Sequence, residues 1–180
     1  MSHIRTKVGA LLCLFVVVLG ACGSSKAAVD SHNAADVTFT QGMIPHHEQA
    51  IDMANLVLAD GADAKVKDLA QRIKAAQDPE VKLMKGWLST WGEKEMAMDG
   101  SMAGHSMNGM VSGDEMKALG GLKGADLDKR FVALMIAHHD GAIEMANTQL
   151  KNGKSAAVKT LANAVVKAQQ AEIDEMKKLS

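Results

Sequence analysis

The sequence is poor in cysteine, proline, aromatic residues and net charge. Its 180 residues include 2 Cys, 2 Pro, 2 Trp, 3 Phe and no Tyr, and the formal net charge is -1. Because a nearly neutral chain offers no strongly basic face for phosphates, we expect no nucleic-acid partner. Few aromatic residues beside many Ala, Leu, Lys, Glu and Met count against a β-sandwich or barrel and favour helices. The length fits one domain or two very small ones.

The first residues predict export and lipid attachment. Arg5 and Lys7 precede an uncharged run, residues 8–21, which is too short to span a bilayer as a helix and is typical of a signal peptide. The run ends in Leu-Gly-Ala before Cys22, which resembles the lipobox of bacterial lipoproteins. A plain signal peptide with an incidental cysteine is the alternative. We therefore expect a signal peptide over residues 1–21 and a lipid on Cys22, which would anchor the chain to the outer side of a bacterial cell membrane.

The scarcity of cysteine then excludes several kinds of chemistry. Cys13 leaves with the signal peptide and Cys22 is acylated, so the exported chain keeps no free thiol and no disulfide. Thiolate catalysis, cysteine-type zinc sites and disulfide scaffolds are excluded together. Residues 22–35 are small and polar, and we expect them to form a flexible tether between the lipid and a single folded domain over residues 36–180.

The folded domain contains an internal repeat at a constant offset of 92 residues. Residues 36–55 (DVTFTQGMIPHHEQAIDMAN) and 128–147 (DKRFVALMIAHHDGAIEMAN) are identical at 11 of 20 positions, and the register continues from 66–85 to 158–177. Each copy has two amphipathic segments of helical period joined by a short break with glycine, which predicts an αα-hairpin. Two hairpins predict an all-α four-helix bundle with pseudo-two-fold symmetry, because one hairpin alone cannot bury its apolar stripe.

A glycine-rich linker separates the two copies. The first copy covers residues 36–91, the linker 92–124 and the second copy 125–180. The linker holds eight glycines, enough to break regular helix over most of its length. Within it, Ser112 and Glu115 resemble a capping box, which predicts the start of one short helix.

Each copy places two adjacent histidines on the inner face of its first helix. With about 100° of rotation per residue, His46 and His47 share one arc with Met43, Met53 and small alanines. The second copy repeats this arc with His138, His139, Met135 and Met145. The acidic residues of the motif fall on the opposite, solvated side. The predicted core of the bundle therefore contains four histidines among methionines.

The second helix of each copy carries a carboxylate on its apolar face. Glu80 and Gln77 share that face in the first copy, as do Glu172 and Gln169 in the second. A buried carboxylate needs a partner, because an unpaired buried charge costs far more than folding can supply. The two histidines of the facing helix are the available partners.

This polar layer has two interpretations. It can be a satisfied hydrogen-bonded layer that specifies helix register, with methionine as core filler. Histidine pairs that occur twice, each with a methionine three or four positions earlier and with Glu and Met on the facing helix, favour metal binding. The sequence leaves open which histidine of each pair is a ligand, and Met53 and Met145 are expected to pack only. The candidate ligands in the core are His46, His47, His138, His139, Met43, Met135, Glu80, Met84, Glu172 and Met176.

The linker holds a second group of candidate ligands. Its methionines lack the apolar periodicity that would bury them in a core. Thioethers are soft ligands that select Cu(I) over zinc, magnesium or calcium. We therefore expect copper, with another transition metal as the alternative, and a low-complexity loop as the metal-free interpretation. The linker candidates are Met96, Met98, Met102, His105, Met107 and Met110.

The repeated F-x3-M-I-x-H-H-x2-A-I-x-M-A, followed by Q-x2-E-[VI]-x2-M, resembles the domain-of-unknown-function 305 family of exported bacterial proteins. The resemblance covers residue 36 to about residue 179. It implies a ferritin-like four-helix fold and an association with copper binding and copper tolerance. The resemblance also implies that the repeated His, Met and Glu residues named above as core candidates match the motif positions of the family.

Three classes of function follow from the sequence. The first is a lipid-anchored copper-binding protein that sequesters or transfers Cu(I) or Cu(II) through His and Met ligands. The second is a ferritin-like metallo-oxidase, although the Glu-x-x-His pattern of dinuclear sites is absent: Leu83 follows Glu80 by three residues, and Glu175 follows Glu172. The third is a metal-free interaction module with a structural His-Glu layer. We expect no catalytic residue, although the sequence leaves enzyme activity uncertain.

Overall fold

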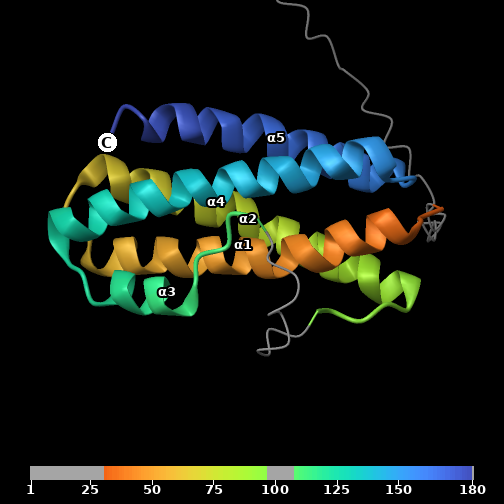
Figure 1. Cartoon of the computed structure of the whole chain (residues 1–180), viewed down its shortest axis with the longest axis horizontal. Helices are drawn as coiled ribbons and strands as arrows, with labels where there is room; N and C mark the ends of the chain where they lie inside the picture. The colour runs from red at the N-terminus through yellow and green to blue at the C-terminus, as the bar shows by residue number, and fades with distance from the viewer. Residues whose placement is uncertain (1–30, 97–107, 180) are drawn as a thin grey trace, which may run out of the picture.

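The computed structural model describes residues 31–96 and 108–179. Within these ranges the chain forms helices and no strand, which confirms the predicted all-α class, and four long helices lie along one axis with the short helix α3 beside them (Figure 1). No helix of the described residues is long and apolar enough to cross a membrane. The helices are α1 (Ala34–Asp60), α2 (Ala64–Trp91), α3 (Gly113–Gly120), α4 (Gly124–Asn152) and α5 (Ala156–Met176).

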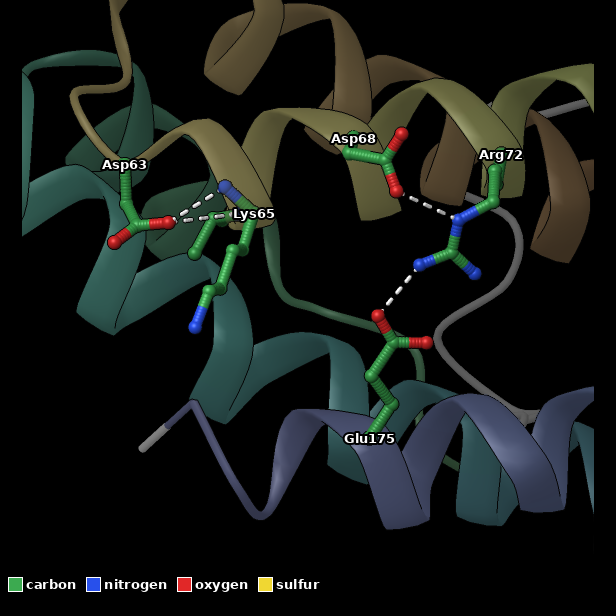
Figure 2. Close-up of polar contacts among 6 residues, drawn as sticks. Asp63, Lys65, Asp68, Arg72 and Glu175 are labelled. Carbon is green, nitrogen blue, oxygen red and sulfur yellow. Dashed lines mark hydrogen bonds and ion pairs between the residues drawn. The ribbon is translucent and has the colours of Figure 1, made fainter.

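Local capping explains where the helices begin. The Asn33 side chain accepts hydrogen bonds from the first-turn amides of α1, and Asp36 completes a capping box, so α1 starts two residues before the domain boundary expected at residue 36. Asp63 caps α2 by accepting from the amides of Lys65 and Val66 (Figure 2). Serine-based caps begin α3 and α5.

The linker contains the expected short helix and otherwise few helical residues among those described. A capping box between Ser112 and Glu115 starts α3, which confirms that prediction. Gly92 ends α2 in the left-handed region, with φ +74°, where glycine has no steric penalty. The two prolines, Pro45 and Pro79, lie inside α1 and α2, which continue through them. Each proline removes one helical hydrogen bond without ending its helix.

The helices pair as two hairpins. α1 packs against α2 and α4 against α5, and the main contact between the hairpins is formed by α1 and α4. Two apolar clusters fill the interior, one at each end of the bundle. Phe131 and Leu69 belong to one cluster, and Phe39 and Leu88 to the other. The polar residues predicted for the core lie between these clusters in all four long helices.

Two equivalent aspartates cross-link the hairpins. Asp36 at the start of α1 accepts, through Oδ2, from the amides of residues 154–155 at 3.0 and 3.1 Å, in the turn between α4 and α5. Asp128 near the start of α4 accepts, also through Oδ2, from the amides of residues 62–63 at 2.9 and 2.7 Å, in the turn between α1 and α2. Both aspartates are buried. Each hairpin therefore supplies the carboxylate that holds the turn of the other.

A surface ion pair links the outer helices of the two hairpins. Arg72 of α2 donates from Nη2 to Glu175 of α5 at 2.5 Å and from Nε to Asp68 one turn earlier at 3.0 Å (Figure 2). All three side chains are well exposed, with 41–70% of the side-chain surface accessible. Such exposed pairs contribute little stability, because water screens the charges.

Candidate metal centre

Four buried histidines occupy the middle of the bundle, between the two apolar clusters. His46 and His47 lie on α1, and His138 and His139 lie on α4, with at most 1% of each residue exposed. Their position confirms the inner faces expected from helical rotation. The histidines form one polar layer because α1 and α4 are in direct contact at the interface between the hairpins.

The outer histidine of each pair is bonded to a glutamate on the neighbouring helix. His47 Nε2 lies 2.8 Å from Glu80 Oε2, and His139 Nε2 lies 2.7 Å from Glu172 Oε2. These contacts confirm the pairing expected between each carboxylate and a facing histidine. Since a carboxylate accepts, Nε2 donates, and in the neutral form of each ring the lone pair is therefore on Nδ1.

The other two histidines meet across the pseudo-two-fold axis. The ring centroids of His46 and His138 are 3.8 Å apart, with the planes tilted by 44°. His46 Nε2 also lies 3.2 Å from the carbonyl oxygen of Asn108, in the segment that leads into α3. Among the described residues, neither nitrogen of His138 makes a hydrogen bond of good geometry, and only the backbone of His46 approaches the ring.

Burial keeps the central pair uncharged. Desolvation, with added repulsion from the nearby His47, lowers the pKa of His46 to about 3. Desolvation also lowers the pKa of His138 well below 6.5, with added repulsion from His46 and His139. Both rings are therefore neutral at physiological pH and keep a lone pair. Nδ1 of all four histidines is buried without a hydrogen-bond partner in the described part of the chain, and so is Nε2 of His138.

Buried thioethers flank the histidine layer on both sides. Met43 and Met84 belong to the cluster on one side, and Met135 and Met176 belong to the cluster on the other. All four are fully buried. The pseudo-symmetry therefore places one methionine pair against each face of the layer.

The two methionines expected only to pack behave differently. Met53 is fully buried in the core. Its repeat equivalent Met145 is half-buried. Met145 lines a surface groove of about 530 Å³ between α1 and α4, together with Glu144 and Asn108. The inward placement predicted for Met145 is therefore only partly correct. At this position the helix faces the surface groove, so the side chain is not enclosed by the core.

The described residues limit what the layer can hold in this conformation. Within residues 31–96 and 108–179, no three His, Cys, Asp or Glu side chains are placed to hold one metal ion together. An ion bound here would therefore combine few nitrogen or oxygen ligands with thioethers. Four of the candidate linker ligands lie outside the described residues: Met98, Met102, His105 and Met107. The expected lipid-attachment residue, Cys22, also lies outside them. Met96 and Met110 stand at the edges of the described linker and are half-buried.

Sequence reasoning missed two residues that shape the layer. Asn108 reaches His46 through its backbone, so its side-chain type carries no signal. Gln49 binds the backbone of Val111 with both ends of its amide, at 2.8 Å each. The sequence does show that this position is unusual. The motif reads HHEQA in the first copy and HHDGA in the second, so the two copies differ here, with Gln49 in one and Gly141 in the other.

Comparison with known proteins agrees with this architecture. A family model described as a domain of unknown function, DUF305, matches residues 36–180. The chain belongs to the DUF305 family. This confirms the resemblance drawn from the repeated histidine motif. A comparison with curated proteins found no match.

Solved structures of other DUF305 proteins share the fold. A Streptomyces coelicolor protein described as secreted is 34% identical, with a TM-score of 0.74, over 81% of this chain and 91% of that one. CopM in a Cu(II)-bound form is 33% identical, with a TM-score of 0.70, over 80% of this chain and 94% of that one. CopM in a Cu(I)-bound form is 31% identical, with a TM-score of 0.65, over the same shares.

Proposed function

We propose that this DUF305 protein binds copper outside the cytoplasm and sequesters or transfers it through histidine and methionine ligands. The observation that carries the proposal is the central layer of four buried histidines, each with an unpartnered Nδ1. Leaving such atoms without a partner in a dry core is costly, and a metal ion relieves that cost. The copper-bound forms of CopM, a related protein, support the choice of metal.

The ligands we propose in the core are the four histidines with the flanking methionines. Neutral imidazoles suit several transition metals, whereas buried thioethers favour Cu(I). Cu(I) accepts low coordination numbers, which agrees with the absence of any three-residue His, Cys, Asp or Glu group among the described residues. The proposed set is His46, His47, His138, His139, Met43, Met84, Met135 and Met176.

The two glutamates have a different role in this proposal. Glu80 and Glu172 already accept from Nε2 of His47 and His139, so they orient these rings and direct Nδ1 to the metal. Histidines that bind metals usually donate their other ring N–H to a carboxylate or a carbonyl. The geometry therefore favours the glutamates as orienting partners over direct ligands.

The linker methionines and His105 form a second, exchangeable group of ligands in this proposal. Their soft thioethers suit Cu(I) delivery to or from the core. The lipobox-like residues before Cys22 support export with a lipid anchor, which would keep the domain close to the outer surface of the membrane. In that setting the membrane and the metal ion are the expected partners.

A structural His-Glu layer without metal is the second candidate function. The observation in its favour is that both carboxylate–histidine pairs already form in the structure, at 2.8 and 2.7 Å. A ferritin-like metallo-oxidase has less support, because the described residues assemble no carboxylate-rich ligand group.

A Cu(I) competition titration tests the proposal. The purified protein, under ascorbate, should take Cu(I) from a chromophoric chelator, and the double variant His46→Ala/His138→Ala should lose most of this capacity. His32→Ala is the matched control, because His32 stacks on Trp91 outside the layer. Leucine at Met98, Met102 and Met107 should remove part of the capacity and leave helicity intact. Binding no tighter than that of the double variant would refute the copper proposal.

Thermal unfolding without metal separates the structural alternative. If the layer is only structural, the double variant should be much less stable than the wild type in the metal-free state. If the layer binds metal, Cu(I) should stabilise the wild type and not the variant, which in the metal-free state loses the packing of two buried rings and the His46 contact with Asn108.

A further inference from the structure

The repeat makes His46 and His138 equivalent in sequence, but the structure treats them differently. His46 Nε2 donates to the carbonyl oxygen of Asn108 at 3.2 Å, since a carbonyl can only accept. This fixes the hydrogen of His46 on Nε2 and its lone pair on Nδ1. Among the described residues, His138 makes no hydrogen bond of comparable geometry and only approaches the backbone of His46, so its tautomer is less firmly fixed. The difference comes from the described end of the linker, where the Asn108 carbonyl contacts His46 and not His138.

We call residues 108–111 the strap, and side chains from both hairpins hold it. Gln49 of α1 binds Val111 through both its amide nitrogen and its amide oxygen. Glu144 of α4 accepts from the side-chain amide of Asn108 at 2.5 Å. Since the Gln49 contacts are buried, water does not compete with them. The strap is therefore anchored at both of its ends.

Two glycines allow the strap to lie against α4. A Cβ atom at Gly141 would stand 1.9 Å from the Asn108 carbonyl oxygen, so any side chain there would displace the strap. Gly109 has φ +85° and packs on the α4 backbone, where a Cβ would stand 2.7 Å from the Ala137 carbonyl oxygen. The first copy has Gln49 in place of Gly141. The same position of the repeat thus holds the strap by hydrogen bonds in the first copy, through Gln49, and leaves space for it in the second copy, at Gly141.

The strap provides a hydrogen-bond acceptor for Nε2 of His46, as the glutamates do for Nε2 of the outer histidines. His47 and His139 each donate Nε2–H to a carboxylate, and His46 donates Nε2–H to the Asn108 carbonyl. In the neutral form of these three rings, the lone pair is therefore on Nδ1. Carboxylates and backbone carbonyls are the usual partners of the second nitrogen of a metal-binding histidine.

We infer that the strap is a positioning element of the metal centre: through the Asn108 carbonyl it fixes His46 as an Nδ1 ligand. This inference rests on the proposed copper function and deepens it. His138 lacks a partner of this kind among the described residues, so it is the ligand whose tautomer can adapt to the metal. The centre is then asymmetric, with three pre-oriented rings and one adaptable ring, although the sequence repeat is symmetric.

The variant Gly141→Ala tests the inference, with Gly86→Ala as its control. Both changes add one methyl group to a long helix, but a Cβ at Gly86 meets nothing within 4 Å. Gly141→Ala should displace the Asn108 carbonyl and lower Cu(I) affinity by about 10- to 100-fold, the usual effect of losing such a partner. Gly86→Ala should leave Cu(I) affinity unchanged. Gln49→Leu, which frees the strap at Val111 without adding bulk to α4, should act in the same direction as Gly141→Ala.

Nitrogen-15 NMR of the histidine rings gives a readout that needs no metal. In the metal-free wild type, His46 should show one tautomer with hydrogen on Nε2, and in Gly141→Ala and Gln49→Leu it should show a mixture. An unchanged His46 tautomer in both variants would overturn the inference, and so would unchanged Cu(I) affinity despite a changed tautomer. Absence of Cu(I) binding by the wild type refutes the proposed function instead, while the tautomer result still decides what the strap does to His46.

Discussion

The four buried histidines differ in the group that holds Nε2. Two are held by carboxylates and one by a backbone carbonyl, and the fourth is held by no group of the described residues. The chemistry of each ring therefore depends on its neighbours, because the partner of one nitrogen decides which form the other takes. Single substitutions of these partners should change metal binding more than they change folding.

Replacement of Glu80 by Ala should weaken Cu(I) binding by about tenfold or more, because His47 loses the partner that fixes its lone pair on Nδ1. Glu80→Gln keeps an oxygen that can accept and should lose less. A competition titration measures both variants, and Glu93→Ala, at an exposed position just after α2, serves as the control. Equal affinity of Glu80→Ala and the wild type would count against the orienting role.

Asp36 makes stability depend on pH. Burial alone would raise the pKa of Asp36, but hydrogen bonds from Lys154, Gln149, Asn33 and Ser155 outweigh it and lower the pKa below 3.8. The folded state thus favours the carboxylate. The resulting stability is complete above the unfolded-state pKa, near 3.8, and is lost as pH falls through the lower folded-state pKa.

Asp36→Asn should therefore cost about 2–3 kcal/mol at neutral pH, since one amide oxygen cannot satisfy the same donors. Urea unfolding from pH 7 to pH 2.5 measures the difference from the wild type, which should shrink below pH 4. Asp52→Asn, at an exposed position of α1, is the control and should be nearly neutral. A difference that stays constant to pH 2.5 would disprove the assignment.

The helices themselves were largely predictable. Apolar residues at helical spacing located all four long helices, and the Ser112 capping box located α3. Helical rotation also placed both histidine pairs inward and opposite Glu80 and Glu172. These features depend on neighbours within a few turns, where one-dimensional periodicity is informative.

Contacts between elements were not predictable from periodicity. The contact of His46 with His138 depends on how α1 crosses α4, and the strap depends on a backbone carbonyl 62 residues away from His46. Asp36 and Asp128 were visible as identical residues of the repeat, but nothing local shows that each binds the turn of the other hairpin. Such pairings become visible only in three dimensions.

The ion pair between Arg72 of α2 and Glu175 of α5 should contribute little to the free energy of unfolding. Arg72→Gln should reduce stability by less than about 1 kcal/mol, and the loss should disappear at high salt, because the charges are exposed and screened. Urea unfolding at low and high salt measures this, with Lys82→Gln on the exposed face of α2 as control. A loss of several kcal/mol that persists at high salt would show that this pair is a structural tie between the hairpins.

For the whole molecule, the layer lies where the two hairpins meet, so a bound ion would join them. Cu(I) at a free concentration of 100 times its Kd should stabilise the fold by about 2.7 kcal/mol. For a chain of this size that corresponds to a rise in Tm of roughly 5–10 °C. Calorimetry under ascorbate measures the shift, and the His46→Ala/His138→Ala variant should show little of it. A shift of equal size in that variant would place the metal elsewhere.

The crossed aspartates also bear on how the two halves of the chain come together. Because Asp36 closes the turn of the second hairpin and Asp128 closes the turn of the first, neither half is complete by itself. A single hairpin carrying this aspartate is completed only by a second hairpin of the same kind, so the contact that joins the halves is built into the repeat itself. Separately expressed halves of the present chain should accordingly find one another and rebuild the bundle in trans.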